Sequence, residues 1–186
     1  MKIAHPKITH LAHRYWEEIL DRGGTAIDAT VGNGHDTLVL ARLLQGKGKV
    51  IGYDIQEQAL ENTKRLLGEH MEHVTLHLAS HEDFGSLRAT LIVYNLGYLP
   101  GGDKSLTTKR STTLKSLESA LHVLEPGGAL SIMCYPGHEE GELEEREVFL
   151  WAKNLPSSEW SVCEHRWINR QKAPSLLLIW RQSKRI

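Results

Sequence analysis

The stretch that decides the fold is Thr25–Thr37, TAIDATVGNGHDT, in which a short apolar segment leads into a glycine turn. The apolar start predicts a buried strand, and Gly32-Asn33-Gly34 forms a turn that only small residues can make. An apolar helix is expected to follow, over residues 36–44. A strand, a glycine turn and a helix in this order bring backbone N–H groups close to a nucleotide-like ligand.

A second acidic residue lies at the spacing expected for ribose binding. Residues 49–54 predict the next strand, and its last residue, Asp54, follows the glycines by about 20 residues. A carboxylate in that position hydrogen-bonds the hydroxyl groups of a ribose. The ligand is therefore expected to be either a dinucleotide or S-adenosylmethionine.

Two residues of the turn favour S-adenosylmethionine. A dinucleotide site has a third glycine where this chain has Thr37, because helix and strand pack closely beneath the pyrophosphate. Asp28, at the end of the first strand, suits the ammonium group of S-adenosylmethionine and is awkward beside a pyrophosphate. The alternative, that Gly32 and Gly34 only form a tight turn, leaves Asp54 without a role.

Length and composition are those of a globular protein. The chain has 186 residues, of which 40% are hydrophobic and 24% charged, enough for one domain with a sizeable core. It has no apolar run long enough to cross a membrane and no secretory segment at its N-terminus, so we expect a cytoplasmic protein. Cys134 and Cys163 do not form a CxxC pair and are interpreted as reduced thiols.

The hydrophobic pattern predicts alternating helices and strands. Helices are expected over residues 8–21, 36–44, 59–67, 108–124 and 142–153, and strands over 25–30, 49–54, 73–78, 89–95, 129–134, 160–168 and 175–180. The last two strands can pair as a hairpin. We therefore expect one α/β domain, 1–186, with a doubly wound, mostly parallel sheet.

Polar side chains follow two of these strands, at the sheet edge that faces the ligand in doubly wound folds. Ser80, His81 and Glu82 follow the third strand and can meet an adenine, or Ser80 can cap a helix. Asn95 ends the fourth strand and opens a glycine-rich loop, 95–104. Its amide is expected either to contact a substrate amine or only to tie the loop backbone.

Asp28-x-x-x-Gly32-x-Gly34, Asp54 and Asn95, with the closing strand pair, resemble class I S-adenosylmethionine-dependent methyltransferases. The segments 95–104, NLGYLPGGDK, and 135–138, YPGH, resemble more specifically a small family once labelled "putative rRNA methylases". That family is now associated with methylation of 5-aminomethyl-2-thiouridine at the wobble position of tRNA. The resemblance covers nearly the whole chain.

The resemblance implies a Rossmann-like, seven-stranded sheet whose last strand is antiparallel, and it implies roles for particular residues. Asn95 corresponds to the asparagine, and Tyr98 to the aromatic residue, of the Asn-Pro-Pro-Tyr motif of amino-methylating enzymes, although Leu96-Gly97 replace its prolines. The expected catalytic residues are Asn95, Tyr98, Asp103 and His138, the last three being candidate proton acceptors. The expected residues for binding S-adenosylmethionine are Asp28, Thr30, Gly32, Asn33, Gly34, Asp36, Thr37, Asp54, Gln56, Ser80, His81, Glu82, Asn95 and Gly97.

An RNA substrate requires basic side chains that reach phosphates. The net charge is −1 and the pI about 6.8, so the bulk charge gives no support to RNA binding. Basic residues nevertheless follow the site loop and gather near the C-terminus; the expected substrate-binding residues are Lys104, Arg110, Arg166, Arg170 and Lys172. The C-terminal basic segment can equally be a solvated edge.

Other clusters are given structural interpretations. His5, His10 and His13, at the start of the first helix, are interpreted as surface histidines, with no metal site, because no cysteine or carboxylate cluster accompanies them. The acidic run over residues 139–147 is interpreted as a solvated helix face.

We expect the anticodon stem-loop of tRNA as partner, no membrane, no metal and a plausible homodimer. The competing functions are an rRNA or small-molecule methyltransferase, a nicotinamide oxidoreductase, which Thr37 and Asp28 disfavour, and a non-catalytic binding protein, which the polar loop disfavours.

Overall fold

A seven-stranded sheet forms the centre of the computed structural model, which describes residues 7–97, 108, 110–170 and 172–183. The strand order is β3-β2-β1-β4-β5-β7-β6. The strands are β1 (Gly24–Asp28), β2 (Gly48–Asp54), β3 (Val74–Leu78), β4 (Ala89–Asn95), β5 (Leu124–Cys134), β6 (Trp160–His165) and β7 (Ser175–Arg181).

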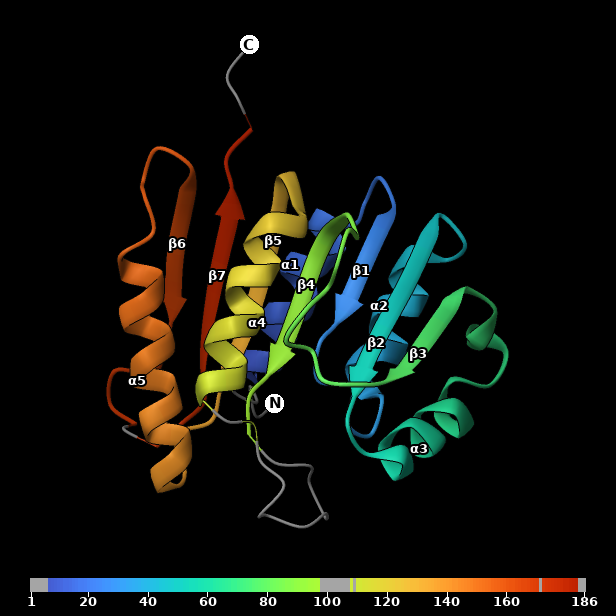
Figure 1. Ribbon diagram of the computed structural model, residues 1–186, viewed down its shortest axis with the longest axis horizontal. Helices are drawn as coiled ribbons and strands as arrows, with labels where there is room; N and C mark the ends of the chain where they lie inside the picture. Colours follow the sequence, from blue (N-terminus) through green and yellow to red (C-terminus); the bar gives the residue numbers. More distant parts are fainter. Residues whose placement is uncertain (1–6, 98–107, 109, 171, 184–186) are drawn as a thin grey trace, which may run out of the picture.

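Only β7 runs against the other strands. The pairs among β3, β2, β1, β4 and β5 are parallel, whereas β7 is antiparallel to both of its neighbours, β5 and β6. The mostly parallel Rossmann-like sheet and the closing hairpin predicted from the sequence are confirmed. As Figure 1 shows, β1, β2, β3, β4 and β6 point toward the same edge. Residues that follow these strands therefore lie along one edge of the sheet.

Helices cover both faces of the sheet (Figure 1). One face carries α1 (Ile8–Ile19) and α2 (His35–Leu44), with α3 (Glu57–Leu67) packed beside α2, followed by the short 3₁₀ helix η1 (Gly68–His73). The other face carries α4 (Arg110–Val123) and α5 (Glu139–Lys153). None of the helices within the described ranges is both long enough and apolar enough to cross a lipid bilayer.

The side-chain alternation of the central strands builds two cores. In β4, Leu91 and Val93 pack with the helices α1 and α2, whereas Ile92 and Tyr94 pack with α4 and α5. Successive side chains of a strand point to opposite faces, so a strand covered on both sides is apolar nearly throughout. This explains why 89–95 is a continuous apolar run in the sequence.

Strand β5 begins five residues earlier than predicted. Leu124 already pairs with Ala89, and the register then shifts so that Ala129 pairs with Leu91. Gly127, with φ of 85°, takes the left-handed conformation that this irregular segment requires. The predicted turn at 125–128 is therefore a bulge within the strand rather than a separate loop.

Strand β6 ends at His165, three residues before the predicted end. His165 is the last residue paired with β7, and the Arg170 N–H donates to the Trp167 carbonyl in a turn. Ile168 is apolar, which favours a longer strand, but it is 97% exposed in this turn.

Candidate active site

The predicted cofactor residues meet at the carboxyl ends of β1, β2 and β4. The Gly32 N–H donates to Asp54 Oδ2 at 2.8 Å, and the Gln56 N–H donates to Asp54 Oδ1 at 2.9 Å. The Asn95 N–H donates to Thr30 Oγ1 at 2.7 Å. Three strand ends are thus joined by hydrogen bonds between residues that are far apart in the sequence.

The glycine turn is shaped by close packing against α3. Gly32 and Gly34 have φ values of 53° and 80°, which favour glycine. A Cβ at Gly34 would lie 2.6 Å from Thr63 Oγ1, and that hydroxyl donates to the Gly32 carbonyl at 3.1 Å. Asn62, also on α3, donates from Nδ2 to Asn33 Oδ1 at 3.4 Å. The turn is therefore held against α3.

Asp28 lies beneath this turn and is fully buried. Its carboxylate accepts from Thr37 Oγ1 at 2.6 Å and from the Thr30 N–H at 3.2 Å. Burial raises the pKa of Asp28 to about 7, and the nearby Asp36 and Asp54 charges add to the rise, while the two hydrogen bonds oppose it. The carboxylate therefore organises the start of the turn; its predicted contact with the cofactor stays a prediction.

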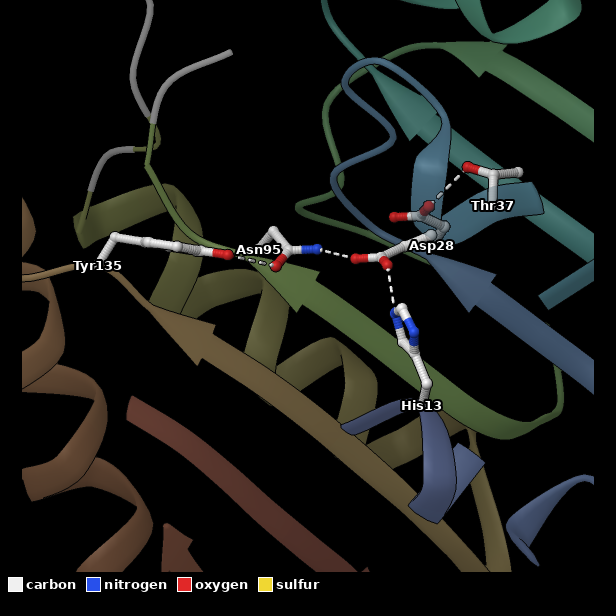
Figure 2. A network of polar contacts seen from close by, with 6 residues as sticks. His13, Asp28, Thr37, Asn95 and Tyr135 are labelled. Carbon is white, nitrogen blue, oxygen red and sulfur yellow. Dashed lines mark hydrogen bonds and ion pairs between the residues drawn. The ribbon is translucent and has the colours of Figure 1, made fainter. Parts of the chain in front are cut away.

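A chain of polar contacts crosses the edge of the sheet beside Asp28 (Figure 2). His13 Nε2 lies 2.8 Å from Asp36 Oδ1, with the two side chains 29% and 18% exposed. The other oxygen of Asp36 accepts from Asn95 Nδ2, and Asn95 Oδ1 accepts from the Tyr135 hydroxyl at 3.4 Å. The chain joins α1, α2, the end of β4 and the residue after β5.

Tyr135 is a phenol rather than a phenolate in this setting. Burial raises its pKa to about 12, and the negative charge of Asp36 contributes to the rise. The hydroxyl therefore keeps its proton and donates a hydrogen bond to Asn95.

His13 was interpreted as a surface histidine, and the structure corrects this: it is half-buried and paired with Asp36.

The segment after β3 is a loop, so the alternative of a helix capped by Ser80 is wrong. The Ser80 hydroxyl instead donates to Glu82 at 3.0 Å. The ring of His81 packs edge-on against Tyr94, with 5.9 Å between centroids, and burial lowers its pKa. The predicted contact of these residues with adenine stays a prediction.

An exposed apolar surface adjoins Asp54. Ile55, the next residue, is 61% exposed, and Leu78, at the end of the neighbouring strand β3, is 56% exposed. A carboxylate for ribose hydroxyls beside an apolar surface for a flat base fits an adenosine. These two side chains were not predicted from the sequence. The available signal was that an apolar residue, Ile55, directly follows Asp54.

The end of β4 is tied to a buried carboxylate. The Gly97 N–H donates to Thr108 Oγ1 at 2.9 Å, and the Thr108 hydroxyl donates to Glu144 at 2.7 Å. Thr113 donates to the other oxygen of Glu144 at 2.6 Å. Glu144 is 3% exposed, and burial raises its pKa. The interpretation of the acidic run as a wholly solvated face is therefore wrong at Glu144, which shares a helical face with the buried Val148.

The candidate proton acceptor His138 caps α5, which consequently begins at Glu139 rather than at residue 142. Its Nδ1 accepts from the Gly141 N–H at 3.0 Å. Accepting a proton at Nδ1 would break this cap. The other two candidates, Tyr98 and Asp103, and the predicted substrate residue Lys104, lie outside the described residues.

The four described candidates for RNA binding differ in how engaged they are. Arg110 is exposed at the first residue of α4. Arg166 is paired with Glu164 and Glu145 and lies over the Phe149 ring. Arg170 lies over the Trp167 ring, 5.5 Å from its centroid, and Lys172 is exposed nearby in the chain. The β6–β7 loop leaves the same edge of the sheet as Asn95.

Two further residues of the site were not predicted from the sequence. Tyr135 was quoted only within a family motif, but it follows β5 directly, and the argument that selected Asn95 applies to it. His13 gave no signal, because its partner Asp36 is 23 residues away and the contact depends on how α1 crosses the sheet.

Comparison with known proteins identifies relatives over nearly the whole chain. The model of the family described as "Putative rRNA methylase" matches residues 50–181. The "tRNA (mnm(5)s(2)U34)-methyltransferase, chloroplastic" of Arabidopsis thaliana is 37% identical, over 95% of this chain and 70% of the relative.

Solved structures give the same result. The crystal structure of a protein from Clostridium thermocellum, described as a "putative rRNA-methylase", matches with a TM-score of 0.91 at 31% identity. The match covers 96% of this chain and 100% of that one. A methyltransferase from Streptococcus mutans, determined in complex with SAH, has a TM-score of 0.85 at 32% identity and covers 96% of this chain and 99% of that one.

Proposed function

This chain belongs to the family described as "Putative rRNA methylase", and we propose that it methylates the aminomethyl group of 5-aminomethyl-2-thiouridine at the wobble position of tRNA. The product is 5-methylaminomethyl-2-thiouridine. The enzyme is an S-adenosylmethionine-dependent methyltransferase, as are its relatives. This product at position 34 of tRNA is the nucleoside in the name of the Arabidopsis thaliana relative, and the aminomethyl substrate is its unmethylated precursor.

The observation that carries the proposal is the orientation of the Asn95 amide at the carboxyl end of β4. Its nitrogen is bound to Asp36, which leaves the amide oxygen to accept hydrogen bonds. An oxygen acceptor can bind an N–H of a substrate amine and turn the lone pair of its nitrogen toward an electrophile. This arrangement supports N-methylation.

The residues around the glycine turn fit the cofactor. Asp54 can bind ribose hydroxyls, Ile55 and Leu78 can pack against the adenine, and the turn at Gly32–Gly34 can approach the methionine portion. S-adenosylmethionine, when bound, supplies a methyl group made electrophilic by a sulfonium. The chain's part in the reaction is to hold the amine about 3–3.5 Å from that carbon and aligned with it.

The substrate amine must be neutral to react. An alkylammonium has a pKa near that of lysine, about 10.4, so most of it is protonated in neutral solution. Burial and a neighbouring sulfonium charge both lower that pKa, so a weak proton acceptor suffices. The amine nitrogen forms the new N–C bond, the C–S bond breaks with its electron pair kept by sulfur, and one proton leaves the nitrogen.

The β6–β7 loop supports an RNA substrate. β6 lies three strands from β4 in the sheet order, which corresponds to about 14–15 Å. Arg170 and Lys172 are exposed there, and within the described residues neither is in an ion pair. Exposed cations at this distance can bind phosphates of nucleotides that flank the reacting base. This supports the prediction that the partner is the anticodon stem-loop.

The proposal is tested with purified enzyme and tRNA that carries 5-aminomethyl-2-thiouridine. Nucleoside mass spectrometry should detect conversion to the methylamino product, and the same tRNA without the aminomethyl group should remain unmodified. Methylation of both tRNAs at another nucleotide, or of ribosomal RNA alone, would contradict the proposal.

A further inference from the structure

We propose that His13, on the N-terminal helix α1, is a positioning residue of the active site that acts through Asp36 to fix the orientation of the Asn95 amide. The inference rests on the function proposed above and adds to it a residue from an element that lies outside the strand–turn–helix ligand site. The contacts that carry it are those drawn in Figure 2.

The three side chains form one continuous chain. His13 Nε2 is 2.8 Å from Asp36 Oδ1, and Asp36 Oδ2 accepts from Asn95 Nδ2. The backbone of Asn95 is held separately, because its N–H donates to Thr30 at 2.7 Å. With the backbone fixed by Thr30, the remaining freedom of Asn95 is the rotation of its side chain, and Asp36 determines that rotation.

Asp36 allows only one of the two orientations of the Asn95 amide. An ionised carboxylate accepts hydrogen bonds and cannot donate, so the amide nitrogen must face it and the amide oxygen must face away. The opposite rotation would set two oxygens against each other. The oxygen is therefore presented toward Tyr135, whose hydroxyl donates to it at 3.4 Å, and it keeps a second lone pair for a substrate N–H.

Asp36 needs a donor on its other oxygen to hold this position. The carboxyl group of Asp28 is close enough for its pKa to respond to Asp36, so a second acid lies nearby. His13 supplies the donor when its Nε2 carries the proton. Its ring packs against Trp16, with centroids 4.7 Å apart, and Trp16 is 3% exposed. The imidazole is therefore supported by a core residue of the same helix.

His13, Trp16, Asp36 and Asn95 also lie around one closely packed gap between α1 and the ends of β4 and β5. Helix α1 thus both covers the sheet and contacts the end of β4 through Asp36. Loss of the His13 donor should let Asp36 and the Asn95 amide shift without unfolding the sheet. Misplacement of this kind can cost about 100-fold in rate.

The first test compares two substitutions at one position. His13→Leu removes the donor and keeps apolar bulk, whereas His13→Gln keeps an N–H that can reach Asp36. We expect kcat to fall about 10- to 100-fold in His13→Leu and to be largely restored in His13→Gln, with the dissociation constant for S-adenosylmethionine unchanged. His10→Ala, at an exposed histidine of the same helix, is the matched control and should match the wild type.

The second test asks whether His13 acts through Asn95. In an Asn95→Ala background, His13→Leu should cause no further loss of kcat, because the group that it positions is gone. Equal losses in both backgrounds, or an unchanged kcat in His13→Leu, would overturn the inference. So would an equal weakening of cofactor binding, since that would place the effect at the cofactor.

A third measurement does not depend on the substrate and so separates this inference from the proposed function. The side-chain amide signal of Asn95 in the ¹⁵N NMR spectrum is identified by its absence in Asn95→Ala. It should shift in His13→Leu and not in His10→Ala. An unshifted signal in His13→Leu would overturn the inference even if the enzyme methylates tRNA as proposed.

Discussion

At the residue scale, Asn95 links the fold to the chemistry, because its backbone binds the β1 loop and its side chain binds α2. Its amide oxygen is the acceptor that we assign to the substrate amine. An interaction of this kind acts on the reacting nitrogen and not on the cofactor. Substitution should therefore separate turnover from cofactor affinity.

We expect Asn95→Ala to lower kcat by about 100-fold or more, since a misplaced amine loses alignment with the methyl carbon. The dissociation constant for S-adenosylmethionine should stay within about threefold of the wild type. Single-turnover methyl transfer and isothermal titration calorimetry measure the two quantities. A loss confined to cofactor binding would refute the role given to Asn95.

Asp28 makes the stability of the cofactor-free protein depend on pH. Its folded pKa of about 7 lies above the unfolded value of 3.8, so the folded state favours the protonated acid. The resulting stabilisation is fully present below the unfolded pKa and is lost as pH rises through the folded pKa. The loss amounts to at most about 4 kcal/mol.

Asp28→Asn replaces the acid with a neutral group of the same shape that can still bond Thr37 and Thr30. Urea unfolding should show that the variant gains stability relative to the wild type between about pH 4 and about pH 7. The gain should level off at higher pH. A difference between the two proteins that is independent of pH would contradict the raised pKa.

Residue identities were predictable where the chemistry is local to one strand end. Asp28, Asp54 and Asn95 each end a strand in an α/β pattern, and the structure places all three at one edge. His13 and Glu144 were interpreted wrongly, because their partners Asp36 and Thr108 come from other elements. Such contacts depend on how helices cross the sheet, which periodicity does not reveal.

At the element scale, the glycine turn between β1 and α2 depends on the space left by α3. Gly34 has a positive φ, and an added Cβ would meet the Thr63 side chain. The turn shape and the position of α3 therefore constrain each other. Both strain and collision oppose any side chain at Gly34.

We expect Gly34→Ala to destabilise the protein by about 1–3 kcal/mol and to weaken S-adenosylmethionine binding, as the turn moves away from the ligand. Gly137→Ala is the stability control, because among the described residues no atom beyond its chain neighbours lies within 4 Å of an added Cβ. Thermal unfolding and cofactor titration check both variants. Unchanged stability and affinity in Gly34→Ala would show that the turn is not closely constrained.

The order and type of the elements were predictable, because each helix and strand has a clear hydrophobic period. The residues at which the helices and strands begin and end were less predictable. The 125–128 segment contains proline and glycines and was predicted as a turn, yet Leu124 already pairs with Ala89. Whether such a segment is a turn or a bulge depends on the neighbouring strand, and therefore on tertiary structure.

At the scale of the whole molecule, the site and the basic loop share one edge of the sheet. Arg170 and Lys172 lie at this edge between β6 and β7, whereas α5 carries six of the chain's 23 acidic residues. A near-neutral protein can thus offer cations locally to an RNA. Binding of this kind is sensitive to salt.

The Arg170→Ala, Lys172→Ala double variant should raise the KM for tRNA several-fold and leave S-adenosylmethionine binding unchanged. The slope of log affinity against log salt should decrease by about 0.7–0.9 for each phosphate that the variant no longer binds. Lys153→Ala, at the far end of α5, is the control and should leave both quantities unchanged. A double variant with the wild-type salt slope would remove this loop from the RNA interface.

The most direct measurement of the central claim is the nucleoside composition of bulk tRNA from cells that lack this protein, determined by mass spectrometry. We predict that 5-aminomethyl-2-thiouridine accumulates and its methylated form disappears, and that the wild-type gene, but not Asn95→Ala, restores the product. An unchanged tRNA profile would contradict the proposed substrate and direct the search to ribosomal RNA or a small molecule.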